Sequence, residues 1–386
     1  MECYFDNAAT TRCGKEAAEL MMAVLTQGYG NPSSLHQKGV EAEQYIRAAR
    51  EKIARTLKCK EKEIFFTSGG TESNNLAIVG AVEANRRAGK HIITTAVEHP
   101  SVSAPMAWLQ EQGWELTILP VDHEGVISLD ALRASVREDT VLVSMMQVNN
   151  EIGAIQPIRE AAAIVRERNP RALIHVDAIQ SYGKIPVFPG SLGIDLMSVS
   201  GHKIRGPKGS GFLYVRDKTR IHPILRGGGQ QKGMRSGTEN VPAIAGLGVA
   251  AEESCSDFEA KAEHLYGLRE RFVAGVADFE GVSVNGRPGR GSAPHIVSVS
   301  VEGVRAEVLL HALEERGIYV SAGSACSSNK PSVSATLQAI GLKPSLLDST
   351  VRFSFSADNA AEEIDYALEQ LRELIPSLRR YTRHGA

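Results

Sequence analysis

Short apolar and β-branched runs alternate with longer amphipathic stretches between residues 63 and 215. The short runs predict strands and the longer stretches predict helices, because apolar residues recur with different periods in the two structures. The predicted strands cover residues 64–66, 92–94, 116–118, 141–143 and 173–176, and the predicted helices include residues 74–87, 129–136 and 158–168. Strands that alternate with helices predict an α/β fold with a mostly parallel sheet.

The C-terminal third of the chain has a different pattern. A long helical stretch begins near residue 258, and the runs near Val282, at 296–299 and at 351–354 predict short strands. Helices are predicted at 306–315 and 362–374, which together with the strands indicates a smaller α+β domain. The Gly- and Pro-rich residues 286–291 predict a surface loop inside it. We therefore expect a large α/β domain over residues 15–257 and a small domain formed by residues 1–14 and 258–386.

Composition and charge narrow the class of protein. The 386 residues are 42% hydrophobic and 23% charged, which is typical of a folded globular chain. A formal net charge of −2 gives no reason to expect a nucleic-acid or membrane surface, and no apolar stretch reaches the length of a membrane-spanning helix. The start of the chain lacks the pattern of a secretory signal, so we expect a cytoplasmic protein.

The cysteines suggest neither a disulfide framework nor a metal site. There are five, scattered and odd in number, and none forms a C-x-x-C pair: Cys3, Cys13, Cys59, Cys255 and Cys326. Reduced thiols in a cytosolic protein are the simplest interpretation.

Lys203 lies in a glycine-rich turn just after the strand-like run at residues 195–198. A lysine in this position can project into a pocket, where desolvation disfavours its charged form and allows its amine to form a Schiff base with an aldehyde. The alternative is a solvated lysine in a surface turn, which is the better interpretation of a lysine considered alone.

Asp177 ends a predicted strand and strengthens the first interpretation. The ring of pyridoxal needs a carboxylate at its protonated nitrogen, because the protonated ring withdraws electrons. Gln180 follows three positions later and could reach the ring's phenolic oxygen. The alternative role for Asp177 is a helix N-cap.

Further polar residues follow other predicted strands. Gly70 and Thr71 open a predicted helix, where backbone N–H groups and hydroxyls suit a phosphate, and Ser200 and His202 could add hydrogen bonds to it. His99 could stack on a cofactor ring and carry protons. A plain capping turn and a hydrogen-bonded loop histidine are the respective alternatives.

Cys326 lies in a stretch of small and polar residues, 320–330. Such a stretch cannot form a core, so we expect an exposed, mobile loop. Free cysteines are usually buried, which makes a thiol on a polar loop a candidate nucleophile. An incidental surface cysteine is the alternative.

Taken together, these motifs resemble the NifS/IscS-type cysteine desulfurases, which are class-V pyridoxal-phosphate enzymes with an aminotransferase-like fold (fold type I). The similarity runs nearly end to end, and the order and joint presence of the motifs are more specific than any one of them. The matching segments are residues 4–11, 30–36, 71–74, 148–153 and 233–238, residues 352–354, and the stretches around Asp177, Lys203 and Cys326.

The resemblance implies a role for each matching residue. Lys203 would carry the cofactor and, once released, remove the α-proton of the substrate, and Cys326 would receive the sulfur as a persulfide. The other implied positions are Asp177 at the pyridine nitrogen, Gln180 at the ring oxygen, His99 stacked on the ring, Gly70, Thr71, Ser200 and His202 at the phosphate, Thr238 at the phosphate of the neighbouring subunit, Asn150 at cofactor and substrate, and Arg352 at the substrate carboxylate.

The implied activity is the pyridoxal 5′-phosphate-dependent conversion of L-cysteine to L-alanine in a homodimer. The sulfur would pass to an acceptor protein, either an iron–sulfur scaffold or an enzyme of tRNA or cofactor thiolation. Two departures from the housekeeping iron–sulfur enzymes concern only this acceptor: the loop between Cys326 and Pro331 is short, and the chain after residue 354 lacks their scaffold-binding pattern. A selenocysteine lyase on the same fold and a non-catalytic scaffold are the alternative functions.

Overall fold

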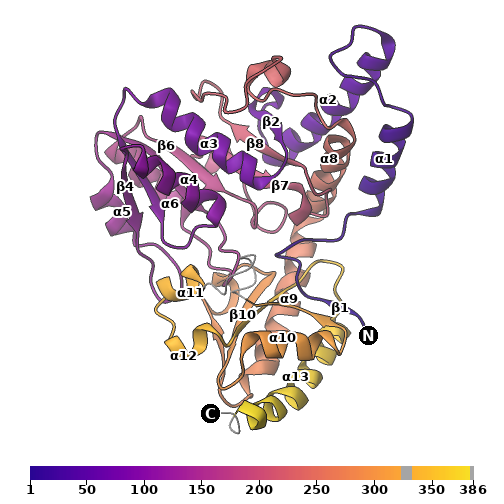
Figure 1. The fold of residues 1–386 in the computed structure, drawn as a ribbon, viewed down its shortest axis with the longest axis vertical. Helices are drawn as coiled ribbons and strands as arrows, with labels where there is room; N and C mark the ends of the chain where they lie inside the picture. Colours follow the sequence, from indigo (N-terminus) through magenta and orange to yellow (C-terminus); the bar gives the residue numbers. More distant parts are fainter. Residues whose placement is uncertain (323–332, 383–386) are drawn as a thin grey trace.

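The computed structural model describes residues 1–322 and 333–382. Its larger part is built on a seven-stranded sheet with the strand order β2-β8-β7-β6-β5-β3-β4 (Figure 1). The strands are β2 (Ile64–Thr67), β3 (His91–Thr95), β4 (Glu115–Leu119), β5 (Thr140–Met146), β6 (Leu173–Asp177), β7 (Leu196–Ser200) and β8 (Gly211–Val215). The structure confirms the predicted α/β fold and its mostly parallel sheet.

Strand β8 is the exception to the parallel arrangement. It pairs antiparallel with both β7 and β2, whereas β7, β6, β5, β3 and β4 are parallel to one another. The chain returns from β7 to β8 through the glycine-rich turn that carries Lys203. This connection is too short for the crossover helix that a parallel neighbour requires.

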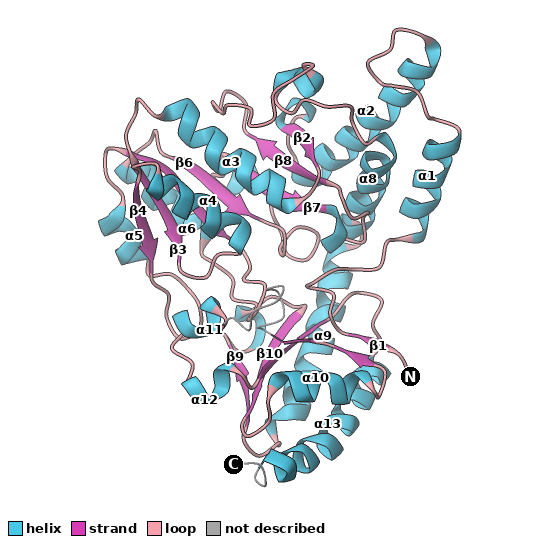
Figure 2. Ribbon diagram, viewed as in Figure 1, coloured by secondary structure: helices cyan, strands magenta, loops and turns pink. Residues whose placement is uncertain are grey.

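Helices cover both faces of this sheet, as Figure 2 shows. Helices α3 and α4 share one apolar core with the sheet, and α2, α5, α6 and α8 share another. The separation follows from the alternation of side chains along each strand: in β3, for example, Ile92 faces the first core and Ile93 the second. The helices are α1 (Lys15–Thr26), α2 (Gln37–Leu57), α3 (Gly70–Asn85), α4 (Pro100–Glu111), α5 (Leu129–Ser135), α6 (Ile158–Arg168), α7 (Pro189–Leu192) and α8 (Val241–Cys255), with 3-10 turns η1 (Glu61–Glu63), η2 (Gly201–Lys203) and η3 (Gln230–Gly233).

The smaller part contains an antiparallel sheet with the order β12-β13-β10-β9, with helices packed on it. Its elements are α9 (Phe258–Ala277), β9 (Val282–Asn285), η4 (Gly289–Gly291), β10 (Ile296–Val301), α10 (Ala306–Glu314), β11 (Ile318–Tyr319), β12 (Ser321–Ala322), α11 (Ala335–Ala339), α12 (Pro344–Leu347), β13 (Thr350–Ser354) and α13 (Ala361–Thr382). The N-terminal strand β1 (Cys3–Tyr4) pairs with β11, so the first residues pack with the C-terminal part. The domain limits at residues 14 and 257 remain a prediction.

No helix in the described part of the chain is both long and apolar enough to cross a bilayer.

Candidate active site

Asp177 and Lys203 lie at the carboxyl ends of two neighbouring parallel strands of the large sheet. Asp177 ends β6, and Lys203 lies in η2 directly after the neighbouring parallel strand β7. The Asp177 carboxylate is buried and accepts two hydrogen bonds, from Asn74 Nδ2 at 2.8 Å and from the Ile179 backbone N–H at 2.9 Å. Burial raises the pKa of Asp177, and these hydrogen bonds together with the nearby His99 and Lys203 oppose that rise.

A hydrogen-bonded chain connects Asp177 to His99, the N-cap of α4. Asn74 Nδ2 also donates to Ser101 Oγ at 2.9 Å, and Ser101 Oγ lies 2.8 Å from His99 Nδ1. His99 Nδ1 accepts from the backbone N–H of Ser101 as well, so the proton of the neutral ring belongs on Nε2. Burial lowers the pKa of His99, which favours this neutral form.

The turn before α3 forms the next wall of the site. Gly69 has φ +152°, and a Cβ added at Gly70 would lie 2.2 Å from Ile179 Cδ1 and 3.4 Å from Ser200 Cβ. The backbone at the start of α3 therefore packs closely against the end of β7, where the buried Ser200 lies. Thr71, in the first turn of α3, is exposed. The N-terminus of a 16-residue helix attracts anions through its unpaired N–H groups.

Lys203, Gln180 and His202 all contact the N-terminal segment. Lys203 Nζ donates to the carbonyl oxygens of Ala8 and Ala9 at 2.6 and 2.7 Å, and Gln180 Nε2 donates to that of Ala8 at 2.8 Å. His202 Nδ1 lies 3.2 Å from Thr10 Oγ1. Burial, with the charges of nearby lysines, lowers the pKa of His202 to about 4, so its ring is neutral at pH 7.

Arg352, on β13, faces the same region from the smaller part. Its two terminal nitrogens donate to Asn150 O at 2.8 Å and to Asp6 Oδ1 at 2.9 Å. Arg352, Asn150 and His99 line a cavity of about 230 Å³ between the two parts of the molecule. Ala322 and Val333 line this cavity too, and they flank the segment 323–332. Cys326 itself lies outside the described residues.

Thr238 is not brought together with the other predicted residues. It is exposed and lines a different cavity, with Ser68 and Arg235. Its role toward a neighbouring subunit remains a prediction.

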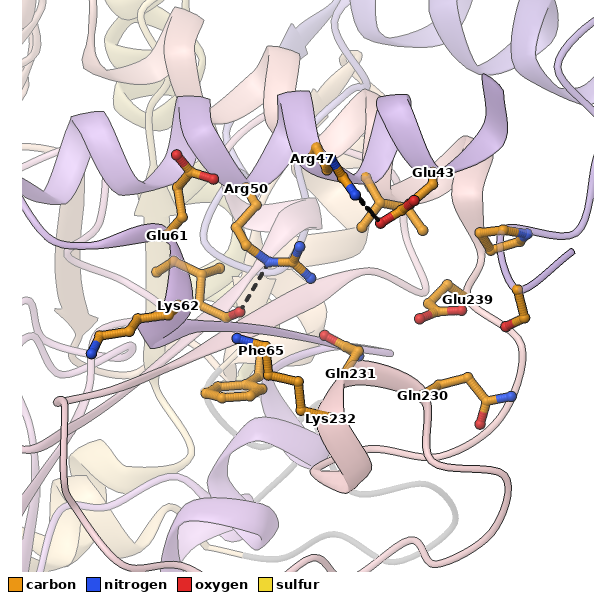
Figure 3. A pocket seen from close by; sticks show the side chains of 14 residues that line it. Glu43, Arg47, Arg50, Glu61, Lys62, Phe65, Gln230, Gln231, Lys232 and Glu239 are labelled. Atoms are coloured by element: carbon orange, nitrogen blue, oxygen red, sulfur yellow. Dashed lines mark hydrogen bonds and ion pairs between the residues drawn. The ribbon is translucent and has the colours of Figure 1, made fainter. Parts of the chain in front are cut away.

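Figure 3 shows a third cavity, of about 530 Å³, between α2 and the loop around η3. Arg47, Arg50, Gln231 and Lys232 line it. The side chain of Gln231 hydrogen-bonds both the N–H and the carbonyl oxygen of Phe66. None of the predicted site residues that the structure describes lines this cavity, so we do not assign it to the site.

Sequence reasoning missed several residues at the site. Asn74, Ser101 and Asp6 orient the predicted residues, and Glu98 lies in the cavity wall next to His99. Glu98 Oε1 accepts two hydrogen bonds, Oε2 has no hydrogen-bond partner among the described residues, and burial raises the pKa of this carboxyl to about 8. Glu98 immediately precedes His99 in the loop after β3, and this position was its only signal. Among the described residues, no cluster of His, Cys, Asp and Glu is arranged for a metal ion.

These groups fit pyridoxal phosphate. The buried Asp177 carboxylate accepts hydrogen bonds but has no ion-pair partner among the described residues, and a protonated pyridine nitrogen would supply its counter-charge. The glycine turn before α3 lets backbone N–H groups come close to a phosphate. Lys203 lies close enough to Asp177 and His99 for its charge to lower the pKa of each.

Comparisons with known proteins agree with this geometry. Residues 3–367 match the family model described as aminotransferase class-V. The cysteine desulfurase IscS of Methanosarcina thermophila is 44% identical over 376 residues, which cover 97% of this chain and 92% of that protein. A solved structure named NifS-like protein superposes with a TM-score of 0.92 at 39% identity and covers 98% of this chain and 100% of its own. The structure named SspA in complex with cysteine gives 0.81 at 33% identity over 93% of this chain and 100% of its own. The chain therefore belongs to the aminotransferase class-V family and, within it, to the IscS/NifS-type cysteine desulfurases.

Proposed function

We propose that this protein is a cysteine desulfurase that uses pyridoxal 5′-phosphate to convert L-cysteine to L-alanine and to transfer the sulfur to Cys326. One observation carries the proposal: the Asp177–Asn74–Ser101–His99 hydrogen-bond chain ends at His99, which lines the same cavity as Arg352, and the charge of Lys203 acts on both Asp177 and His99. A buried acid, a neutral imidazole, a lysine and a guanidinium are the groups that chemistry at the α-carbon of an amino acid requires.

The cofactor would lie with its ring nitrogen at Asp177 and its phosphate at Gly70, Thr71, Ser200 and His202. When bound, pyridoxal phosphate supplies an electron sink for negative charge at the substrate's α-carbon. The hydrogen bonds from Asn74 and Ile179 hold both oxygens of Asp177 in place for the ring. Gln180, anchored to the carbonyl oxygen of Ala8, would lie at the ring oxygen.

The remaining roles concern the substrate's carboxylate and protons. Arg352 would bind the carboxylate together with Asn150, since a buried guanidinium binds carboxylates strongly and in a fixed orientation. The Lys203 amine would take the α-proton. Nε2 of His99 would exchange protons with the substrate, because Nδ1 is held by Ser101.

Cys326 would then act as the nucleophile. Its thiolate attacks the sulfur of the substrate, an S–S bond forms and the C–S bond breaks. The electron pair of the broken bond stays with the β-carbon, which takes a proton. The α-carbon takes back the proton that Lys203 removed, and the product leaves as L-alanine. The persulfide on Cys326 would pass its outer sulfur to an acceptor protein, either an iron–sulfur scaffold or a thiolation enzyme. We further propose that the enzyme works in the cytoplasm as a homodimer in which Thr238 reaches the partner's phosphate.

The direct test is the reaction itself. With L-cysteine and a thiol reductant, the purified yellow protein should release alanine and sulfide in equal amounts, measured by amino-acid analysis and a sulfide assay. The same assay with selenocysteine distinguishes the proposed desulfurase from a selenocysteine lyase. Turnover of selenocysteine with no alanine from cysteine would identify a selenocysteine lyase instead.

Arg352→Lys should raise the KM for L-cysteine about 10- to 100-fold, with a smaller change in kcat. The reason is that lysine keeps the charge but loses the planar pair of donors, and hydrogen bonds to charged groups contribute about 1.5–3 kcal/mol. Steady-state kinetics measure both parameters. The matched control is Arg271→Lys, which alters an exposed Arg–Asp365 pair and should leave KM unchanged. An unchanged KM in Arg352→Lys would refute the carboxylate role.

A further inference from the structure

Lys184 is a second lysine behind the site, and the proposed reaction does not use it. It lies in the turn after β6, where its backbone N–H donates to Ser181 O at 3.0 Å. Because β6 and β7 are parallel neighbours, this turn lies beside η2. The Nζ atom of Lys184 donates to the main-chain carbonyl oxygen of Lys203 at 2.9 Å. The two lysines also line one small cavity of about 80 Å³.

The ammonium of Lys184 has no counter-ion among the residues that the structure describes. No acid of the described residues lies within ion-pair distance of it, and its hydrogen bond goes to a neutral carbonyl. Burial, and then the charge of Lys203, lower the pKa of Lys184 to about 7. Lys184 is half-buried, and a cation partly removed from water without a carboxylate beside it is costly, so its position beside another lysine calls for a functional reason.

The other charged groups around Lys184 and Lys203 do not place a further positive charge beside the Lys203 amine. Asp177 acts in the opposite direction, because its carboxylate favours the protonated amine of Lys203. Burial lowers the pKa values of His99, His202 and His295, so the rings from α4, η2 and the start of β10 are neutral near pH 7. Of the remaining charged groups of the small cavity, Arg205 pairs with Asp358 and Glu253 is acidic. Lys261 donates to Glu253 O, and its charge is not among those that shift the pKa of Lys184.

We propose that Lys184 is an electrostatic and positioning partner of Lys203, fixing its main chain and favouring the neutral form of its amine. A neighbouring cation makes a second positive charge less stable, and only the neutral amine can bond to the cofactor's aldehyde or take the α-proton. Lys184 thus offsets Asp177, whose charge the cofactor ring needs but which would otherwise keep Lys203 protonated. The inference rests on the proposed function, in which Lys203 carries the cofactor.

The test is a pH titration of the visible absorbance of the bound cofactor, which reports protonation at the Lys203 nitrogen independently of turnover. In Lys184→Met the midpoint should rise by roughly half a unit to one pH unit, because the cationic form loses a repelling neighbour. Lys184→Arg keeps the charge and should leave the midpoint within about a tenth of a unit of that of the wild type. Lys208→Met removes an exposed lysine of the same loop and serves as the matched control.

Each outcome decides the inference. An unchanged midpoint in Lys184→Met, or an equal rise in Lys184→Arg or Lys208→Met, would overturn it while the wild-type titration still supports the proposed function. A wild-type protein without the absorbance band would overturn both. Circular dichroism and cofactor content, measured on each variant, show whether Lys184→Met folds. If it does not fold, Lys184→Gln takes its place with the same expected rise.

Discussion

Lys203→Ala should yield a colourless protein that releases alanine from cysteine at least ~10³-fold more slowly than the wild type. Under the proposed mechanism, this side chain both anchors the cofactor and takes the α-proton, and its neighbours cannot replace it. Lys184 points at the Lys203 backbone, and the His99 ring is fixed by Ser101 at its Nδ1. Absorbance spectra of the purified variant and the alanine assay measure the two effects separately.

Lys208→Ala is the matched control for this prediction. Lys208 lies in the same glycine-rich loop but is exposed, so its removal should change neither colour nor rate. Added pyridoxal phosphate should bind to Lys203→Ala only weakly, through Asp177 and the turn before α3, and should dissociate on gel filtration. A yellow Lys203→Ala protein with wild-type turnover would show that another amine carries the cofactor.

Much of the fold could be predicted from the sequence, because buried parallel strands leave a strong local pattern. The runs at residues 92–94 and 141–143 correspond to β3 and β5, whose residues are buried on both faces of the sheet. The antiparallel direction of β8 could not be predicted in this way. It depends on the short return from β7 through the Lys203 turn, and a hydrophobic pattern carries no information on strand direction.

Candidate site residues that follow strands could be named from the sequence, whereas those that depend on tertiary contacts could not. Asp177 ends β6 and Lys203 follows the end of its parallel neighbour β7, so the sequence places them together once the sheet is assumed. Asn74 and Ser101 belong to two helices, and their bridge from Asp177 to His99 exists only because α3 and α4 pack side by side. Lys184 was missed for the same reason, since its partner is a backbone oxygen of another turn.

Cys326 remains the candidate nucleophile because the environments of the other four cysteines disfavour their thiolate forms. Burial raises the pKa of Cys3 to about 11 and of Cys59 to about 12, and it also raises the pKa values of Cys13 and Cys255. All four are thus held as thiols at neutral pH, whereas the thiolate is the nucleophile. The residues that flank the Cys326 segment, Ala322 and Val333, line the cavity of His99 and Arg352.

Cys326→Ala should therefore reduce alanine release by about 10³-fold or more and abolish the persulfide, while the protein stays yellow. This variant should keep its colour but lose turnover, because the cofactor site at Asp177 and Lys203 remains complete. Lys203→Ala should lose both. Radiolabelled cysteine and mass spectrometry of the intact protein measure the bound sulfur. Cys13→Ala is the control and should keep both label and turnover. Alanine release that persists in Cys326→Ala at the wild-type rate would mean that the sulfur is taken by another thiol, such as that of the reductant, and not by Cys326.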